Sequence, residues 1–328
     1  MLITPEELKQ EIKLSKEEIK QVINQQQQIS NILNWKDSRK LIIAWPCSMD
    51  FKESVINYWQ QLKVLQKKYE NKALFVMRTY DSKPRTTVWW KWMIQWWEFW
   101  SKADINEWLR NSRKIMKEII SLWLPVANEL LYPWIYNYQN DILSYIAIGA
   151  RSSEDQWHRE LASATQAPVG IKNPTSGDIQ ITANNLIATR SPQQIFIPWM
   201  EFYSQWNPNS HIILRWANFN WESYPNISDE FINRINKILQ EKWISTKYII
   251  DLNHDNSWKN ADLQIENMRI SKKLKNFDKI AGFMVESYLF DGNQKADENN
   301  LESIEKWKSI TDPYISIEKL EVLIKELF

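Results

Sequence analysis

Residues 73–91 read Ala-Leu-Phe-Val-Met-Arg-Thr-Tyr-Asp-Ser-Lys-Pro-Arg-Thr-Thr-Val-Trp-Trp-Lys. The first five residues form an apolar run that is typical of a buried strand. Three cations, Arg78, Lys83 and Arg85, follow the run directly, and Pro84 stiffens the loop between two of them. Planar guanidinium groups and a nearby Lys suit the oxygens of phosphate or carboxylate groups. A solvated basic loop is the alternative interpretation of this stretch, and the other strand ends decide between the two.

The same pattern recurs from Lys40 onward: a short apolar run, a polar residue at its end, and then a helical stretch. Eight such runs are present, at residues 41–44, 74–77, 124–127, 145–148, 168–171, 211–214, 248–250 and 281–285. Helical stretches at 52–69, 105–122, 229–242 and 263–275 fall between them. We therefore predict an α/β fold, a (β/α)8 TIM barrel, which is the economical solution for about 250 residues. A doubly wound open sheet ranks second, because no glycine-rich dinucleotide fingerprint follows the first run.

Two segments lie outside the predicted barrel. Residues 1–38 are polar and helical, with capping boxes that begin at Thr4 and Ser15. We expect this extension to make oligomer or regulatory contacts, and residues 39–328 to form the catalytic barrel. A small β insertion is predicted near residues 193–209, where Ile-Phe-Ile at 195–197 resembles an extra strand.

Charge-capable side chains follow all eight runs: Cys47, Arg78, Glu129, Arg151, Lys172, Arg215, His254 and Glu286. In a barrel the carboxyl ends of the strands form one mouth, where active sites lie. Unpaired charges buried there would be costly, so they need ligands. We expect one set to form a strongly cationic pocket with enough positive charge for two anionic groups: Arg78, Lys83, Arg85, Arg151, Lys172 and Arg215.

A second set at the same mouth mixes sulfur, nitrogen and oxygen donors: Cys47, His254, Glu286 and Asp312. Such a set suits a divalent transition metal. No close-spaced metal motif such as H-E-x-x-H is present, so the metal interpretation depends on the barrel bringing these residues together. Taken singly, a Cys is usually a small buried hydrophobe, and a His in a polar loop is usually only hydrogen-bonded.

Composition excludes several classes of partner. The chain has 41 Lys and Arg against 40 Asp and Glu, so no global field attracts nucleic acid or an anionic membrane. No apolar run approaches the roughly 20 residues of a membrane helix, and the polar N-terminus is unlike a signal peptide. The single cysteine excludes an internal disulfide and fits a reducing compartment. We expect a cytoplasmic protein.

The tryptophan content is anomalous. The chain has 20 Trp and only 5 Gly, whereas Gly usually makes up about 7% of residues. Several Trp stand in turn-like contexts, such as Asn34-Trp35-Lys36-Asp37, where Gly, Asn, Asp, Ser and Pro are favoured. We hypothesise that most of these positions are glycine in the living protein, because its UGA codons are decoded as glycine, with Trp90 the best candidate for a true tryptophan. A Trp-rich binding surface is the rival interpretation, but these residues follow no helical or strand period.

Motifs along nearly the whole chain resemble those of one enzyme family. Residues 45–48, Trp-Pro-Cys-Ser, resemble its G-P-C-S, and residues 83–92 resemble its K-P-R-T-T-x-G-W-K-G. Further matches lie at 148–151, 158–163, 168–173, 213–215, 284–287, 292–294 and 309–312. On these motifs the chain resembles 3-deoxy-D-arabino-heptulosonate 7-phosphate (DAHP) synthase of the short microbial type I group.

The resemblance implies condensation of phosphoenolpyruvate with erythrose 4-phosphate and release of phosphate, the first step of the shikimate pathway. It implies one divalent ion (Mn, Fe, Co or Zn) held by Cys47, His254, Glu286 and Asp312. It implies that phosphoenolpyruvate is contacted by Arg78, Glu129, Ala150, Arg151, Lys172 and Arg215, and erythrose 4-phosphate by Lys83, Arg85 and Thr86. The catalytic residues would be Lys83, His254 and Cys47. A homodimer or homotetramer and inhibition by an aromatic amino acid would also fit the family.

The sequence departs from the family pattern in two ways. Trp replaces the family glycine at positions 45, 89, 92, 216, 258 and 307, which is the same anomaly that the composition shows. Asn253 stands before His254, where the family usually has Ser. Two alternative functions follow: a sibling synthase that uses another phosphosugar, such as arabinose 5-phosphate, or a catalytically silent effector-binding barrel if the Trp residues are real.

Overall fold

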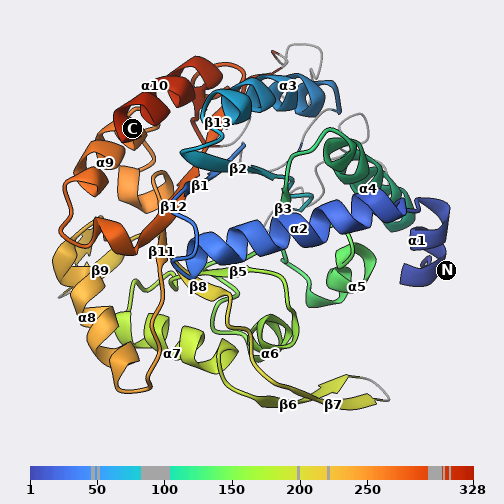
Figure 1. The fold of residues 1–328 in the computed structure, drawn as a ribbon, viewed down its shortest axis with the longest axis horizontal. Helices are drawn as coiled ribbons and strands as arrows, with labels where there is room; N and C mark the ends of the chain where they lie inside the picture. The colour runs from blue at the N-terminus through green and yellow to red at the C-terminus, as the bar shows by residue number, and fades with distance from the viewer. Residues whose placement is uncertain are drawn as a thin grey trace.

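Eight parallel strands close into a barrel in a computed structural model that describes residues 1–45, 49, 52–82, 104–197, 200–219, 222–294, 305, 307–309 and 312–328 (Figure 1). Their order around the ring is β1-β12-β11-β8-β5-β4-β3-β2. The bounds are β1 (Lys40–Ala44), β2 (Ala73–Arg78), β3 (Val126–Glu129), β4 (Tyr145–Ile148), β5 (Val169–Lys172), β8 (Ser210–Leu214), β11 (Tyr248–Asp251) and β12 (Ile280–Val285). Each of the eight predicted runs overlaps one of these strands. The TIM barrel is confirmed, and the open sheet is excluded.

Helices surround the barrel and bury one apolar face each against it (Figure 1). They are α3 (Lys52–Lys68), α4 (Ile105–Ser121), α6 (Gln156–Ala164), α7 (Ile179–Thr189), α8 (Asp229–Gln240), α9 (Leu263–Lys272) and α10 (Ile317–Leu327). Between β3 and β4 stand only the short η2 (Pro133–Ile135) and α5 (Tyr136–Gln139). Side-chain caps start several helices; Asp155, for example, accepts from the backbone N–H of His158 at α6. None of the helices in the described ranges is long and apolar enough to cross a membrane.

The N-terminal segment contains α1 (Pro5–Glu11) and α2 (Lys16–Leu33), and both predicted capping boxes are present. In Figure 1, α2 crosses the ring of strands. Its Ile29 and Ile32 pack in the same apolar cluster as the inward-facing residues of the strands. Lys247, which directly precedes β11, donates from Nζ to the carbonyl of Ile32 at 2.9 Å. The helix therefore covers the amino end of the barrel and leaves the carboxyl end for the site.

Short β elements decorate the barrel. The predicted insertion is an antiparallel hairpin of β6 (Gln193–Ile197) and β7 (Met200–Ser204), which projects from the body in Figure 1. A second hairpin, β9 (Ala217–Phe219) with β10 (Glu222–Tyr224), was not predicted, because three-residue strands are too short to show a period. β13 (Ser287–Tyr288) pairs with β14 (Ile315–Ser316) and ties the chain after β12 to the last helix.

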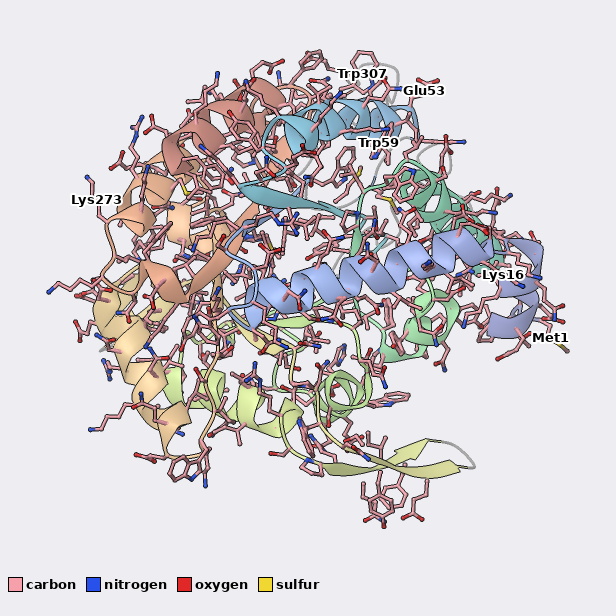
Figure 2. The ribbon with its side chains drawn as sticks, viewed as in Figure 1. Met1, Lys16, Glu53, Trp59, Lys273 and Trp307 are labelled. Carbon is pink, nitrogen blue, oxygen red and sulfur yellow. The ribbon has the colours of Figure 1, made fainter. Side chains whose placement is uncertain are left out.

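Tryptophans occupy backbone conformations that large side chains rarely adopt. Nine described residues other than glycine have positive φ, and seven of them are Trp: Trp35, Trp45, Trp123, Trp206, Trp243, Trp258 and Trp307. One of the seven, Trp307, lies beside α3, the helix on which Trp59 is labelled in Figure 2. Its side chain lines a small cavity together with residues of that helix. Only Gly reaches the left-handed region without steric cost.

Candidate active site

The carboxyl ends of the strands gather charged side chains, as predicted. Arg78 ends β2, Lys172 ends β5 and Asp251 ends β11, while Glu286 directly follows β12. All four are almost fully buried, with only 0–4% of the surface of each residue exposed to solvent. Burial of that depth is tolerated only when charges are paired.

Each cation of this cluster faces a carboxylate. Arg78 Nη2 lies 3.2 Å from Glu286 Oε1, and Lys172 Nζ lies 3.3 Å from Asp251 Oδ2. Arg215, which follows β8, pairs with Asp255 at 2.9 Å near the solvent. These cations come from three different strands, so an anionic ligand at the mouth would meet them together.

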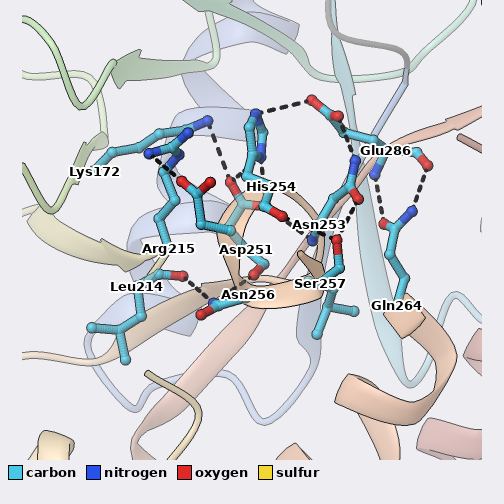
Figure 3. Close-up of polar contacts among 12 residues, drawn as sticks. Lys172, Leu214, Arg215, Asp251, Asn253, His254, Asn256, Ser257, Gln264 and Glu286 are labelled. Atoms are coloured by element: carbon cyan, nitrogen blue, oxygen red, sulfur yellow. Dashed lines mark hydrogen bonds and ion pairs between the residues drawn. The ribbon is translucent and has the colours of Figure 1, made fainter. Parts of the chain in front are cut away.

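His254 stands between two buried carboxylates (Figure 3). Its Nδ1 is 2.8 Å from Asp251 Oδ2, and its Nε2 is 3.3 Å from Glu286 Oε1. Burial by itself would raise the pKa of the Asp251 carboxyl, but His254, Lys172 and Arg78 together hold that pKa well below its usual range. Asp251 is therefore ionised and accepts a hydrogen bond from His254 Nδ1, which keeps a proton on that ring nitrogen. The His254 backbone itself has φ 50°, a strained conformation of the kind that functional sites retain.

The donor set fits a cation. When Nδ1 carries the proton, Nε2 has a lone pair and lies 3.3 Å from a carboxylate oxygen. Two such atoms repel unless a proton or a metal ion lies between them. The observed 3.3 Å is also the separation of nitrogen and oxygen ligands that each lie about 2.1 Å from one ion in a near-tetrahedral arrangement. An imidazole nitrogen and a carboxylate oxygen are common ligands of divalent transition metals.

The position of Glu286 is fixed from several sides. The side chain of Gln264 on α9 makes two hydrogen bonds to the Glu286 backbone, one to its carbonyl and one from its N–H, each 2.9 Å long. Asn253 Nδ2 donates to Glu286 Oε2 at 2.6 Å. The remaining oxygen, Oε1, is the one that faces Arg78 and His254.

Glu129 and the loop after β4 occupy a neighbouring part of the mouth. A Cβ atom at Gly149 would lie 2.0 Å from Glu129 Oε1, so glycine is required there for the carboxylate to keep its place. Ala150 follows, half-buried, and its carbonyl accepts from Ser153 Oγ at 3.1 Å. Arg151 is exposed at the rim.

Several polar residues of the site were missed from the sequence. The sequence prediction names His254 at the end of this strand, whereas Asp251 is the first polar residue after the apolar run and contacts His254 directly. Asn173, directly after β5, accepts from the Arg215 backbone N–H at 2.7 Å. Gln264 lies inside a helix, where the sequence carries no sign of a contact with Glu286.

Some predicted residues remain untested. Cys47, Lys83, Arg85 and Thr86 lie outside the described residues. Asp312 is described, and its main-chain carbonyl accepts from Ser309 Oγ, but no described contact joins its carboxylate to His254 or Glu286. Within the described ranges, no group of three or more His, Cys, Asp and Glu side chains is arranged to hold a metal ion. The structure thus unites His254 and Glu286, and the four-ligand set stays a prediction.

Fold and site together define a (β/α)8-barrel protein whose carboxyl-end mouth gathers Arg78, Lys172 and Arg215 near His254 and Glu286. The whole chain has relatives of this kind. The model of the DAHP synthetase I family matches residues 11–325, and the chain belongs to that family.

Named relatives agree with this membership. The "phospho-2-dehydro-3-deoxyheptonate aldolase, Trp-sensitive" of Buchnera aphidicola is 35% identical over 99% of this chain and 94% of its own length. The corresponding Tyr-sensitive protein of Escherichia coli is 32% identical over 100% of this chain and 92% of its own length. The solved structure of the phospho-2-dehydro-3-deoxyheptonate aldolase from Francisella tularensis superposes with a TM-score of 0.91 at 32% identity, covering 100% of this chain and 96% of that one.

Proposed function

We propose that this chain is a DAHP synthase, an enzyme that condenses phosphoenolpyruvate with erythrose 4-phosphate and releases phosphate as the first step of the shikimate pathway. Family membership over the whole barrel supports the reaction class. The observation that carries the proposal is the site itself. Arg78 pairs there with Glu286 and Lys172 with Asp251, the two carboxylates that flank His254, and Arg215 pairs with Asp255 next to His254.

Phosphoenolpyruvate has a phosphate and a carboxylate, and both need cations. Arg78 and Lys172 are buried at the strand ends, whereas Arg215 and Arg151 lie nearer the rim. Guanidinium groups bind such oxygens through two parallel hydrogen bonds, and Lys adds a compact charge. Arg78 and Lys172 already neutralise Glu286 and Asp251, so an arriving anion would share these cations with carboxylates that are held in place.

The reaction makes one carbon–carbon bond and one carbon–oxygen bond, the latter from water, and it breaks the carbon–oxygen bond to the phosphate. C3 of phosphoenolpyruvate attacks the aldehyde carbon of erythrose 4-phosphate, water adds to the cationic C2, and phosphate leaves from the resulting tetrahedral centre. Arg78, Arg215 and Lys172 would hold the phosphate through this sequence and offset its growing charge as it departs. Lys83, by resemblance a catalytic residue, would assist beside the erythrose 4-phosphate contacts Arg85 and Thr86.

A divalent ion would be held by His254 and Glu286, with Cys47 and Asp312 as the further ligands that the resemblance implies. Such an ion, Mn, Fe, Co or Zn, supplies Lewis-acid polarisation of the aldehyde oxygen when bound. The protein's own contribution is to present the ligands correctly. Asp251 keeps the proton of His254 on Nδ1, so that Nε2 is available.

Regulation by an aromatic amino acid is a second part of this proposal. Relatives are named Trp-sensitive and Tyr-sensitive. A cavity of about 810 Å³ lies between α2, the end of α6 and the β6–β7 hairpin, with Ile23, Gln27, Thr165 and Tyr203 among its lining residues. Its volume is sufficient for an amino acid ligand, and the helix from the N-terminal extension forms one wall. We place the inhibitor there, in a cytoplasmic homodimer or homotetramer.

Consumption of phosphoenolpyruvate with erythrose 4-phosphate tests the reaction, with and without a chelator and with arabinose 5-phosphate as the competing aldehyde. We expect turnover that requires erythrose 4-phosphate and stops on chelation. Preference for the five-carbon sugar would indicate the sibling synthase. A folded, ligand-binding protein without turnover would indicate the silent barrel.

A further inference from the structure

Asn253 hydrogen-bonds to the same two carboxylates that flank His254. It directly precedes His254 and is 1% exposed. Its Nδ2 donates to Glu286 Oε2 at 2.6 Å, and its Oδ1 accepts from Ser257 Oγ at 2.8 Å. Its backbone N–H donates to Asp251 Oδ1 at 3.1 Å. One residue therefore touches both carboxylates between which His254 stands (Figure 3).

These contacts assign the two oxygens of Glu286 to different tasks. The Gln264 side chain fixes the main chain of Glu286, but it does not determine the rotation of the carboxylate. Asn253 does so, because its donor holds Oε2 and turns Oε1 toward His254 Nε2. The hydroxyl of Ser257 in turn orients the Asn253 amide, which leaves Nδ2 on the carboxylate side.

We propose that Asn253 is a positioning residue for the cation site, and that its amide sets cation affinity by aiming Glu286 Oε1 at the space beside His254. This inference rests on the metal dependence in the proposed function. Partners that orient ligating side chains typically contribute a 10–100-fold effect on metal affinity. Serine, the usual family residue at this position, has a hydroxyl on a shorter side chain and lacks the second polar atom that Ser257 engages.

Equilibrium dialysis with Mn²⁺, with no substrate present, tests this role independently of activity. We expect N253A to bind Mn²⁺ about 10–100-fold more weakly than the parent, and N253S to recover part of the loss. The matched control is N267A. Asn267 is also a buried amide, and it donates to the carbonyls of Leu252 and Asn256 at 3.0 Å without touching Glu286. N267A should lose thermal stability but keep parental Mn²⁺ affinity.

The outcomes separate the inference from the proposed function. Equal Mn²⁺ affinity in N253A and the parent, both folded by circular dichroism, overturns the role of Asn253, as does a parent that binds no Mn²⁺. Weakened binding in N253A with no synthase turnover in the parent supports the role of Asn253 and rejects the reaction.

A second inference concerns the seven Trp residues with positive φ, and it depends on their backbone conformation and not on the contacts of Asn253. Trp35, Trp123 and Trp243 stand just beyond the C-terminal ends of α2, α4 and α8 with φ of 57°, 74° and 57°. Around Trp35 and Trp243 the chain makes the bond that closes a Schellman motif, from Lys36 N to Asn31 O and from Ile244 N to Leu239 O. Glycine is the preferred residue at that position.

The side chains at these positions gain little in compensation. Trp243 is 96% exposed and Trp123 is 71% exposed, so their indoles are barely buried. Trp45 is the opposite case, fully buried against Tyr58 and Tyr288, yet its indole N–H has no hydrogen-bond partner in the part of the chain that the structure describes. A buried N–H without an acceptor costs about 1–3 kcal/mol.

We infer that residues 35, 45, 123, 206, 243, 258 and 307 are glycine in the protein as its source organism makes it, and that the codon underlying them, UGA, is translated there as glycine. Glycine would remove the strain at all seven positions, and at position 45 it would open space two residues before Cys47.

Peptide mass spectrometry of the protein purified from its source organism tests this directly, together with the codons of the gene. We expect glycine masses and UGA codons at all seven positions. Tryptophan masses there, or UGG codons, would overturn the inference.

Discussion

Glycine at two of the exposed helix ends should stabilise the recombinant chain that contains tryptophan. Trp123 and Trp243 have φ of 74° and 57° and are 71% and 96% exposed, so W123G and W243G remove strain and little packing. A left-handed backbone costs an L-residue about 1–2 kcal/mol, which glycine would recover at each position. Glycine also raises the conformational entropy of the unfolded chain, which offsets roughly 0.4–1 kcal/mol of that gain at each position. We expect the double variant to gain about 1–2 kcal/mol in free energy of unfolding.

Urea unfolding followed by circular dichroism measures this gain, with the slope m unchanged between parent and variant. The control is W157G. Trp157 is 44% exposed but lies in the first turn of α6 and is not among the residues with positive φ. Glycine there relieves no strain and should cost roughly 0.5 kcal/mol. The reasoning fails if W123G/W243G is less stable than the parent, or if W157G stabilises the protein by a similar amount.

Two other substitutions test the interior of the barrel. His211 is buried with its Nε2 2.8 Å from the Tyr145 hydroxyl, and burial lowers the pKa of its imidazole to about 4. Because the folded chain holds His211 neutral, protonation favours the unfolded chain. The neutral imidazole therefore contributes fully to stability above the unfolded pKa near 6.5, and this contribution is lost as the pH falls toward 4. Between these values the parent should lose roughly 3 kcal/mol more than H211Q in free energy of unfolding, and parallel pH profiles would contradict the assignment. The second substitution is G149A, whose Cβ would lie 2.0 Å from Glu129 Oε1. Displacing that carboxylate should lower kcat/KM for phosphoenolpyruvate by about 100-fold with little change in Tm. Unchanged kinetics in G149A would contradict the proposal that Glu129 contacts the substrate.

Much of the architecture could be predicted from local patterns. Each barrel strand is a short apolar run that a polar or charged residue follows. Both predicted N-terminal capping boxes are present, with Thr4 and Ser15 as the N-cap residues. The hairpin β9–β10 could not be predicted, because its strands of three residues have no measurable period. The tryptophan anomaly was visible in the composition, but only backbone dihedral angles identified which positions demand glycine.

The sequence by itself determined the barrel, its number of strands and which charged residues stand at the strand ends, because these properties depend on neighbours along the chain. Only the tertiary structure decided the pairings. Arg78 meets Glu286 across 208 positions of sequence, and Gln264 reaches Glu286 from inside a helix. The role of Asn253 was equally hidden, because the rotation of one carboxylate depends on donors from several elements. Closure of the ring brings those elements together, and no local pattern encodes the distance between atoms on different strands.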